Sequence, residues 1–376
     1  MLNRFKAAFG VICIFFCTIF AALSLNPNSQ FKDPRFLEAL KAGEREESFF
    51  ENWSSEDKFE ESYAVEMAKD PSEDFVILNL SDIQLFGFQS RNKGGRLAKA
   101  TIQSLVDSTK PDLITVTGDN AWDSKAYLDF VDMMDSFDIP WAPVMGNHDG
   151  QFTPGEFWCA YLLANAENCL FKFGPKDMGY GNYIINITEN GKIIHTLFMV
   201  DTHSKNSFKN EKGKTKRGYD HLWENQFQWY KWAVDGIADK AGKVVESTVF
   251  MHIPVYEYQT ALDDAGYDYK KNIFTNPEYL SSATGQRREP VCCPPVNTGF
   301  FDLCKSSGST KTMICGHDHT NYFTIDYQGI TLAYSVKCGK GCSWAKDDNG
   351  GTEISINSSG KATVSQHFVN PDTLDY

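Results

Sequence analysis

The distribution of apolar residues divides the chain into three parts. Residues 1–24 form a short, largely apolar start. Residues 25–72 are rich in charge and poor in long apolar runs, so we expect a pro-segment or an extension that wraps the protein, with short helices at Phe36–Ala42 and Phe59–Met67. Residues 73–370 contain short apolar runs that alternate with helical patterns, which predicts one folded domain.

Strand and helix patterns alternate in the first half of this domain. The strand patterns are short and apolar, and the helical ones repeat their apolar positions every three or four residues. Short links between them predict an α/β fold, with parallel strands covered by helices. The expected strands are Phe75–Leu80, Leu113–Thr117, Trp141–Met145 and Ser247–Met251, and the expected helices are Gly94–Thr109, Tyr127–Phe137 and Glu224–Ile237.

Other segments predict antiparallel strands. Tyr183–Ile187 and Ile193–Val200 bracket a turn at residues 189–191, which is a good hairpin signal. His195 alternates with apolar neighbours and is expected to be structural. Further strands with glycine-rich turns are expected in the last third, at Lys311–Ile314, Tyr322–Asp326, Thr331–Val336, Thr352–Ile356 and Thr363–Phe368.

Composition and charge exclude one class of partner. The 376 residues are 42% hydrophobic and 23% charged, as in an ordinary globular protein, and the formal net charge is -13. So acidic a surface repels the phosphates of nucleic acid, so we expect no nucleic-acid partner. The densest basic run, Lys209–Arg217, is expected to be a solvated loop.

The N-terminus carries a compartment signal. Arg4 and Lys6 precede the apolar run Ala7–Leu23, and small residues then favour cleavage of a signal peptide before Leu25. The alternative is an uncleaved anchor, because the run approaches the length that spans a bilayer of ~30 Å. Both interpretations predict a secreted or lumenal protein, in an endomembrane or lysosome-like compartment. Only retention of the segment would make a membrane a partner.

In a secreted or lumenal protein, cysteines can form disulfides and sequons can carry glycans. Eight of the ten cysteines follow the N-terminal segment, so disulfides are expected between near neighbours, whereas Cys315 is either paired or a buried free thiol. The sequons at Asn52, Asn186 and Asn357 are candidate glycan sites, and Asn79 is expected to be buried and bare. The candidate pairs are Cys159 with Cys169, Cys338 with Cys342, and Cys292 or Cys293 with Cys304.

Five polar motifs follow predicted strands. Ligands of an open α/β sheet bind at the carboxyl ends of its strands, so these side chains can converge although they are distant in sequence. Carboxylates, an amide and imidazoles suit divalent or trivalent ions such as Mn, Fe and Zn. Each motif alone is weak, but all five in this order indicate a metal site. They are Ser81-Asp82-Ile83-Gln84, Gly118-Asp119-Asn120, Gly146-Asn147-His148-Asp149, Met251-His252-Ile253-Pro254 and Gly316-His317-Asp318-His319.

This series resembles the ordered motifs of the calcineurin-like metallophosphoesterase superfamily, which are D-x-H, G-D-x-x, G-N-H-[DE], H and G-H-x-H. The resemblance covers residues 74–340, and it extends to the purple acid phosphatase-like branch through Gln226–Trp232, His252-Ile253-Pro254 and residues 316–321. It implies a four-layer αββα sandwich with two mixed β-sheets flanked by helices. It also implies two divalent or trivalent metal ions, Mn, Fe or Zn, at the loop end.

The resemblance implies a role for each matching residue. Asp82 and His319 would hold the first metal, and Asp119 would bridge to the second. His148 would face the substrate, stabilise the transferred phosphoryl group and protonate the leaving oxygen, and Asp149 would orient His148 by a hydrogen bond. Hydrolysis would follow in-line attack by a metal-bridging hydroxide. The second metal would be completed by Asn147, His252 and His317.

The sequence departs from the family pattern at two positions. The first motif has Gln84 where the family has histidine, so Gln84 is a weak or water-mediated ligand, or marks reduced affinity for the first metal. Trp122 stands where purple acid phosphatases have an iron-binding tyrosine, and its indole cannot ligate a metal. A purple iron–tyrosinate enzyme is therefore not expected.

These features predict a phosphomonoesterase, similar to an acid phosphatase, that acts on a phosphorylated small molecule or protein. Two alternatives stay open. One is a phosphodiesterase of nucleotides or lipid head groups, since the same metal pair hydrolyses both ester classes. The other is a weakened relative that binds phosphorylated ligands, which Gln84 alone suggests.

Overall fold

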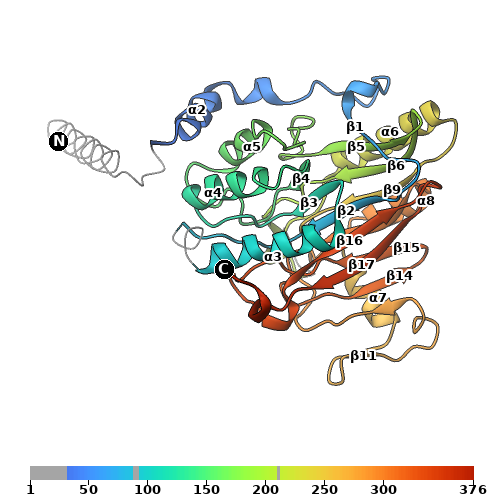
Figure 1. Ribbon diagram of the computed structural model, residues 1–376. Coiled ribbons are helices and arrows are strands. Elements are labelled where there is room, and N and C mark those ends of the chain that lie inside the picture. Colours follow the sequence, from blue (N-terminus) through green and yellow to red (C-terminus); the bar gives the residue numbers. More distant parts are fainter. Residues whose placement is uncertain (1–31, 88–92, 210–211) are drawn as a thin grey trace.

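The fold is a sandwich of two mixed β-sheets with helices on both outer faces (Figure 1). The computed structural model describes residues 32–87, 93–209 and 212–376. The expected αββα architecture is confirmed, and four of its strands, Phe75–Leu80 and Leu113–Thr117 among them, have the expected limits to within a residue or two.

One sheet has five strands in the order β17-β16-β2-β3-β4. Strands β2, β3 and β4 are parallel, and β16 is antiparallel to both of its neighbours. Helix α3 packs on β2 and β16, next to α4 and α5 (Figure 1). The elements are β2 (Phe75–Leu80), α3 (Lys93–Thr109), β3 (Leu113–Thr117), α4 (Ser124–Asp135), β4 (Trp141–Val144), α5 (Glu156–Ala164), β16 (Gly350–Ile356) and β17 (Ala362–Phe368).

The other sheet has eight strands in the order β1-β5-β6-β9-β13-β15-β14-β12. The expected hairpin is present as the antiparallel pair of β5 and β6, and β6, β9, β13 and β15 run parallel. Helices α6, α7 and α8 pack on its outer face. The elements are β1 (Ala64–Ala68), β5 (Tyr183–Glu189), β6 (Lys192–Met199), α6 (Glu224–Ala241), β9 (Glu246–Phe250), α7 (Glu257–Asp264), β12 (Ala283–Thr284), α8 (Phe300–Ser307), β13 (Thr310–Cys315), β14 (Thr324–Tyr327) and β15 (Ile330–Tyr334).

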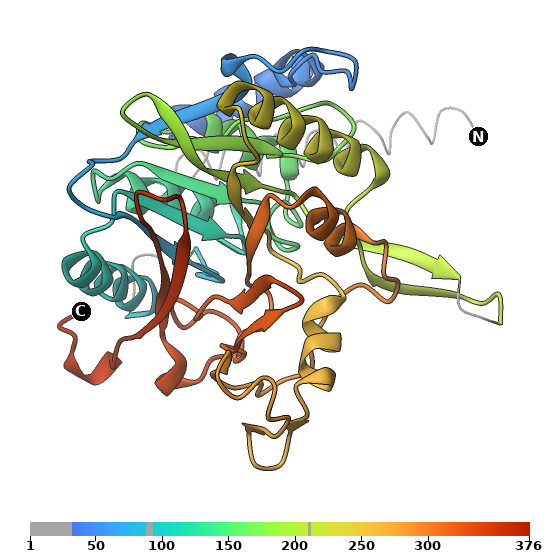
Figure 2. The ribbon, with the colours of Figure 1, turned by 90° about the vertical axis from the view of Figure 1, so that its right-hand side faces the viewer.

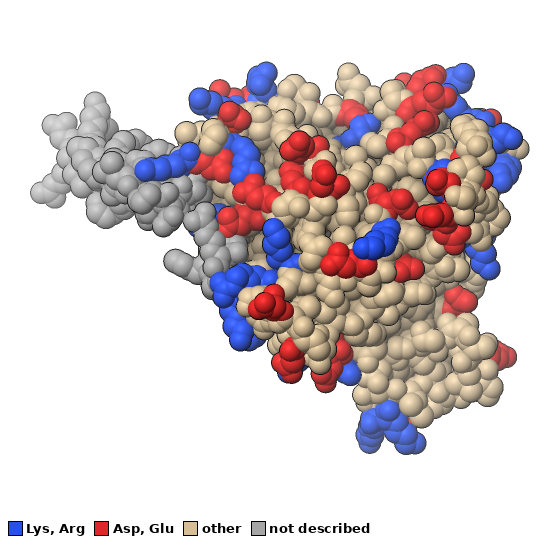
Figure 3. Space-filling model, viewed as in Figure 1, with Lys and Arg blue, Asp and Glu red and all other residues tan. Residues whose placement is uncertain are grey.

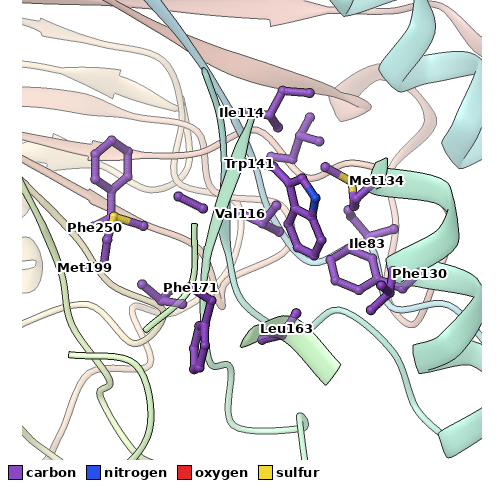
Figure 4. Packing of buried hydrophobic residues seen from close by; sticks show 14 of the residues in the cluster. Ile83, Ile114, Val116, Phe130, Met134, Trp141, Leu163, Phe171, Met199 and Phe250 are labelled. Atoms are coloured by element: carbon purple, nitrogen blue, oxygen red, sulfur yellow. The ribbon is translucent and has the colours of Figure 1, made fainter. Parts of the chain in front are cut away.

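Side-chain alternation along the eight-stranded sheet separates two cores. Met199 and Phe250 face the five-stranded sheet, and Trp141 lies on the other side of that sheet, beside Phe130 and Met134 of α4 (Figure 4). Their neighbours along each strand, such as Phe198, face the opposite way and pack beneath α6, α7 and α8. This period of two is what a strand buried on both faces requires.

The N-terminal extension contributes to the larger sheet. Helix α2 (Pro34–Ala42) confirms one of the two expected helices and packs against α5. The other expected helix, Phe59–Met67, was wrong, because a short 3-10 turn at Glu61–Tyr63 leads into strand β1. Strand β1 pairs in parallel with β5, and backbone pairing outweighs the helical pattern of its side chains.

The basic run Lys209–Arg217 is only partly the solvated loop that the sequence predicts, because Lys209 ends one strand and Thr215–Arg217 belong to another. Strands β7 (Lys205–Lys209) and β8 (Thr215–Tyr219) form an antiparallel hairpin that projects from the body, at the right of Figure 2. A second small hairpin joins β10 (Tyr267–Asp268) to β11 (Ile273–Phe274).

The expected disulfides are not formed. All eight cysteines in the described residues are free: Cys159, Cys169, Cys292, Cys293, Cys304, Cys315, Cys338 and Cys342. Four of them are completely enclosed by the cores, where a cysteine packs as a small hydrophobic residue; the Cys304 thiol, for example, lies beside Tyr230 and Thr310.

The sequons differ in accessibility. Asn79 is buried as expected, but Asn186 is buried too, and its amide oxygen accepts a hydrogen bond from Thr196, so neither can carry a glycan in the folded chain. Asn52 is exposed and Asn357 is half-buried. The expected signal segment, residues 1–24, lies outside the described residues. Among the residues from 32 onward that are described, no helix has the length and apolarity needed to cross a bilayer.

Candidate metal centre

The polar motifs meet at one edge of the sandwich because each follows the carboxyl end of a strand. Asp82 follows β2, Asp119 follows β3 and Asn147 follows β4 in the smaller sheet. His252 follows β9 and His317 follows β13 in the larger sheet. Both sheets therefore contribute side chains to one cluster at the carboxyl ends of their strands, where open α/β sheets bind ligands.

One half of the cluster contains Asp82, Asp119 and His319. One possible ligand atom from each residue lies within 4.8 Å of the other two. The Nε2 atom of His319 is 3.4 Å from Oδ1 of Asp82, and its Nδ1 atom contacts the hydroxyl of Ser343 at 2.6 Å. The Ser343 contact directs Nε2 towards the carboxylates.

The other half contains Asn147, His252 and His317. The Nε2 atom of His252 is 3.1 Å from Oδ1 of Asn147, 3.3 Å from Oδ1 of Asp119 and 3.2 Å from Nδ1 of His317. The Nδ1 atom of His252 donates to the carbonyl of Thr117 at 2.8 Å, which leaves the lone pair of Nε2 facing the cluster.

Asp119 belongs to both halves. Its Oδ1 faces His252, while its Oδ2 accepts a hydrogen bond from Gln84 at 3.1 Å. The two oxygens of Asp119 are therefore directed at the two halves of the cluster.

Two unpartnered atoms test whether the cluster fits a metal. Oδ1 of Asp82 and Nε2 of His317 are buried and have no hydrogen-bond partner among the described residues. Buried polar atoms in native proteins almost always have a partner. Carboxylate oxygens and imidazole nitrogens left unsatisfied in a convergent cluster are the donor set that a divalent cation completes. The site therefore fits the metal that the sequence predicts.

Four non-glycine residues of the site have left-handed backbone conformations, which residues with a Cβ atom rarely adopt. Asp82, Gln84, Asp119 and His317 have φ angles of 53°, 50°, 54° and 77°. Such left-handed conformations cost on the order of 1–3 kcal/mol each and are typical of functional sites. Gly146 is needed for a different reason, because a Cβ atom there would lie 2.1 Å from the backbone nitrogen of Asp119.

Gln84 turns its amide nitrogen, not its oxygen, towards the cluster. The nitrogen lies 3.1 Å from both Oδ2 of Asp119 and Nε2 of His319. The oxygen accepts a hydrogen bond of 2.9 Å from the ammonium of Lys337, which also donates to the carbonyl of Asp82 at 2.5 Å. Lys337 has no acceptor, so a flipped amide would set two donors against each other. The amide oxygen of Gln84 is therefore not directed at the cluster, and the weak or water-mediated coordination expected for Gln84 stays a prediction.

Lys337 is a buried cation that the sequence reasoning missed. It is 2% exposed and follows no motif; only its position after an apolar strand could have drawn notice. Burial lowers the pKa of Lys337, whereas the carboxylates of Asp82 and Asp119 act to raise it. The ammonium group of Lys337 thus lies at the edge of the half-site formed by Asp82, Asp119 and His319.

His148 stands at the open side of the cluster. Its side chain is 27% exposed, and its Nε2 atom is 3.9 Å from Oδ2 of Asp119. The Nδ1 atom contacts Oε1 of Gln151 at 2.9 Å, and the indole of Trp122 lies 4.1 Å from the imidazole between ring centres. Gln151 and Trp122 therefore fix the orientation of the imidazole.

Asp149 has a different partner from the expected one. Its carboxylate accepts hydrogen bonds from the side chain and backbone of Asn120 at 2.8 and 2.9 Å and from the backbone nitrogen of Gly146 at 2.9 Å. It does not contact His148, so the expected hydrogen bond between them was wrong. Asp149 instead ties the turn after β4 to the turn after β3, and Gln151, which sequence reasoning missed, holds the imidazole.

Burial and charge shift the ionisation of the site. Burial and then the negative charge of Asp119 raise the pKa of Asp149 to about 7. Burial disfavours the charge of Asp82, but the neighbouring His319 and His252 outweigh it and lower the pKa of Asp82. Burial and then the charge of His252 keep the pKa of His317 well below its usual value, so His317 is neutral and able to ligate.

A mixed αββα sandwich with carboxylates, an amide and imidazoles at its loop edge defines a metallophosphoesterase. The family model of the calcineurin-like phosphoesterases matches residues 75–321, and the chain belongs to this family. The matched region contains the whole cluster from Asp82 to His319 and excludes Lys337. Within this region, Asp82, Asp119 and His319 form a candidate metal site, as expected for a metallophosphoesterase family.

Relatives of the chain include proteins named as probable inactive purple acid phosphatases and one named as a phosphatase. "Probable inactive purple acid phosphatase 14" of Arabidopsis thaliana is 25% identical over 299 residues, which are 70% of each chain. "Phosphatase DCR2" of Saccharomyces cerevisiae is 29% identical over 276 residues, which cover 68% of this chain but only 44% of that phosphatase.

Solved structures with a related arrangement are more distant in sequence. A dimetal phosphatase from Danio rerio is 12% identical, covers 78% of this chain and 98% of its own, and has a TM-score of 0.41. Purple acid phosphatase PPD1 from yellow lupin seeds is 12% identical, covers 80% of this chain and 52% of its own, and has a TM-score of 0.42.

Proposed function

We propose that the protein is a binuclear metal-dependent phosphomonoesterase. The convergence of six ligand-type side chains, together with two buried ligand atoms that have no hydrogen-bond partner, carries this proposal. Asp82, Asp119 and His319 hold one ion, and Asp119 also reaches the second. The second ion is held by Asn147, His252 and His317. Bound Mn, Fe or Zn would activate a water for in-line attack and neutralise the phosphoryl oxygens.

His148 supplies the proton chemistry in this proposal. Gln151 occupies its Nδ1 atom, so Nε2 is the atom free to face a bound phosphate. As an imidazolium, with Nδ1–H donating to Gln151, His148 would hydrogen-bond the transferred phosphoryl group from the open side of the cluster and pass its Nε2 proton to the leaving oxygen. Trp122 beside it keeps the ring in place and excludes water from one face.

The ester class is tested with two chromogenic substrates. The chelated protein receives Mn, Fe or Zn and is assayed on para-nitrophenyl phosphate and on bis-para-nitrophenyl phosphate. The proposal expects a higher kcat/KM for the monoester. A preference for the diester would replace it with a phosphodiesterase of nucleotides or lipid head groups.

A second candidate is a relative that binds phosphorylated ligands with little turnover. Gln84 in place of a metal-binding histidine and the cation of Lys337 favour it, because both weaken the half-site of Asp82 and His319. Tight phosphate binding without hydrolysis of either ester, under every metal, would support this candidate against the enzyme.

We also propose that the protein acts in a secreted or lumenal compartment. The basic and then apolar pattern of residues 1–24 supports this location. Microscopy and protease protection of the full chain test it, and a cytosolic location would contradict it.

A further inference from the structure

The hairpin of β7 and β8, here called the basic arm, is rooted in the candidate metal centre. Before β7, the hydroxyl of Ser204 donates to the carbonyl of Asn147 at 3.1 Å. At the end of β8, the ring of Tyr219 packs edge-on against the ring of His317, with 4.3 Å between centres. Both strands of the arm therefore begin or end against residues of the proposed metal site.

The arm carries a charge opposite to that of the protein. The described parts, residues 205–209 and 212–219, contain lysine and arginine but no aspartate or glutamate, and Glu211 lies between them in sequence. The whole chain has a net charge of -13, and acidic and basic side chains are interspersed on the face shown in Figure 3. The basic residues of the described arm are Lys205, Lys209, Lys212, Lys214, Lys216 and Arg217.

The strand register assigns the charges to faces of the arm. Lys205 pairs with Tyr219, Ser207 with Arg217 and Lys209 with Thr215, so these six side chains share one face. The other face packs on the body: the ring of Phe208 contacts His221, and Gly218 lies beside Pro295. The face that begins at Tyr219, against His317, is therefore the one that presents Lys205, Arg217 and Lys209.

This face is open and its charges are not neutralised locally. Lys205, Lys209 and Arg217 are exposed. Among the described residues, none of the three forms an ion pair. The ammonium of Lys205 instead lies 5.5 Å from the centre of the Tyr219 ring, which links the charged face to the ring against His317.

The dimensions of the face fit an extended peptide. Side chains on one face of a strand are spaced roughly 7 Å apart, and a strand of five residues spans roughly 17 Å. An extended peptide has the same spacing at every second residue. A small phosphate ester held in the metal site is too short to reach Lys209.

We propose that the basic arm binds acidic residues that flank the phosphorylated residue of a protein substrate. This inference rests on the proposed phosphomonoesterase. The phosphate lies in the metal site, and carboxylates at the second and fourth flanking positions meet Lys205, Arg217 and Lys209 along the arm. Charge complementarity of this kind mainly sets the association rate and specificity.

Binding of a non-hydrolysable peptide tests the arm separately from catalysis. The probe is a fluorescent phosphonate analogue of a phosphoserine peptide with glutamate at the second and fourth positions on both sides, and glutamine replaces glutamate in its control. In fluorescence anisotropy with Mn²⁺ present, the double change Lys209→Glu, Arg217→Glu should weaken binding of the acidic peptide about tenfold. Binding of the glutamine peptide should change little.

Lys216→Glu with Lys243→Glu is the matched control. It changes the net charge equally, but Lys216 is on the opposite face of the arm, and Lys243 lies before β9, at the opposite end of that strand from His252. Its affinity for the acidic peptide should stay near that of the wild type. Circular dichroism shows that each variant is folded.

Three outcomes separate the possibilities. Equal affinity of wild type and the Lys209→Glu, Arg217→Glu variant for the acidic peptide overturns the arm proposal. The proposal is also overturned if the Lys209→Glu, Arg217→Glu variant keeps the peptide affinity of the wild type but no longer sediments with phosphatidylserine vesicles. That result would assign the arm to membrane binding. Arm-dependent peptide binding without hydrolysis of any ester supports the arm and overturns only the phosphomonoesterase.

Discussion

His148 is the residue on which turnover should depend without any effect on metal content. Replacement by alanine removes the proton donor but none of the proposed ligands. We expect kcat on para-nitrophenyl phosphate to fall by roughly 10²–10⁴-fold. Metal content, measured by mass spectrometry, should match that of the wild type. His367→Ala is the control, because His367 lies on β17 and pairs with Glu353. Unchanged turnover in His148→Ala would remove the role given to His148.

The Lys337–Gln84 pair should limit affinity for the ion near Asp82. Replacing Lys337 by methionine removes a buried positive charge, and replacing Gln84 by histidine restores a nitrogen ligand. We expect the double variant to bind Mn²⁺ at its weaker site at least about tenfold more tightly, by calorimetric titration. Lys346→Met removes an exposed charge paired with Asp372 and serves as control. Equal affinity of the double variant and the wild type would show that the pair does not tune the site.

At the residue scale, the sequence predicted which side chains converge better than it predicted their hydrogen-bond partners. Asp82, Asp119, Asn147 and the histidines sit in motifs whose spacing shows that they follow strands. Lys337 and Gln151 act through contacts made only in the folded chain, and neither belongs to a motif. The partner of Asp149 was wrong for the same reason, since a neighbour in sequence is not always the neighbour in space.

At the element scale, the N-terminal extension is fastened to α6 by an aromatic cluster. The indole of Trp232 on α6 contacts the rings of Trp53, Phe59 and Tyr63 in the extension. Its nitrogen donates to the carbonyl of Asp57 at 2.5 Å. The aromatic face of α6 is therefore packing, and part of it packs the extension.

Gly236 on α6 makes room for the extension. A Cβ atom there would lie 2.2 Å from the Cβ atom of Phe59. Gly236→Ala usually stabilises a helix by about 1 kcal/mol, but here overpacking of about 1–3 kcal/mol opposes it. We therefore expect a lower free energy of unfolding in urea. In the Phe59→Gly background, which lacks that Cβ atom, the same change should be neutral or stabilising. Stabilisation by Gly236→Ala alone would show that the contact is loose.

Helices and strands with a clear pattern of apolar residues could be predicted from the sequence. Strands that depend on backbone pairing with another segment could not. Strands β2 and β3 are mainly apolar and almost completely buried, so their ends were found to the residue. Strand β1 is short and only partly buried, and the strands of the basic arm are mainly polar. Both owe their extended form to backbone pairing with another segment. Helices α5, α7 and α8 are only eight or nine residues long and were not foreseen, since so few turns give a weak period.

At the scale of the whole molecule, His195 links the two sheets. It lies on β6, and its Nδ1 donates to the carbonyl of Gly360 in the turn between β16 and β17, at 2.7 Å. Its Nε2 accepts from the hydroxyl of Thr248 at 3.0 Å. The structural role expected for His195 is thus confirmed, and the ring is fully buried.

Protonation of His195 should destabilise the fold in acid. Burial lowers its pKa to about 4, against 6.5 for an unfolded chain, so the unfolded state binds the proton first. The contribution of neutral His195 to the free energy of unfolding is present above pH 6.5 and is lost as the pH falls towards 4. It amounts to about 2 kcal/mol between pH 7 and 5. His195→Gln keeps hydrogen-bonding groups but does not titrate, so its unfolding free energy should fall less over this range. Parallel pH profiles for the two proteins would contradict the assignment.

The central claim is that the cluster at the edge of both sheets holds two metal ions through Asp119. The most direct measurement is the equilibrium metal content per chain after dialysis against Mn²⁺ or Zn²⁺, for the wild type and Asp119→Ala. Since Asp119 faces both halves of the cluster, the account predicts up to two ions in the wild type and loss from both positions in the variant. Wild-type metal content in a folded Asp119→Ala protein would contradict it.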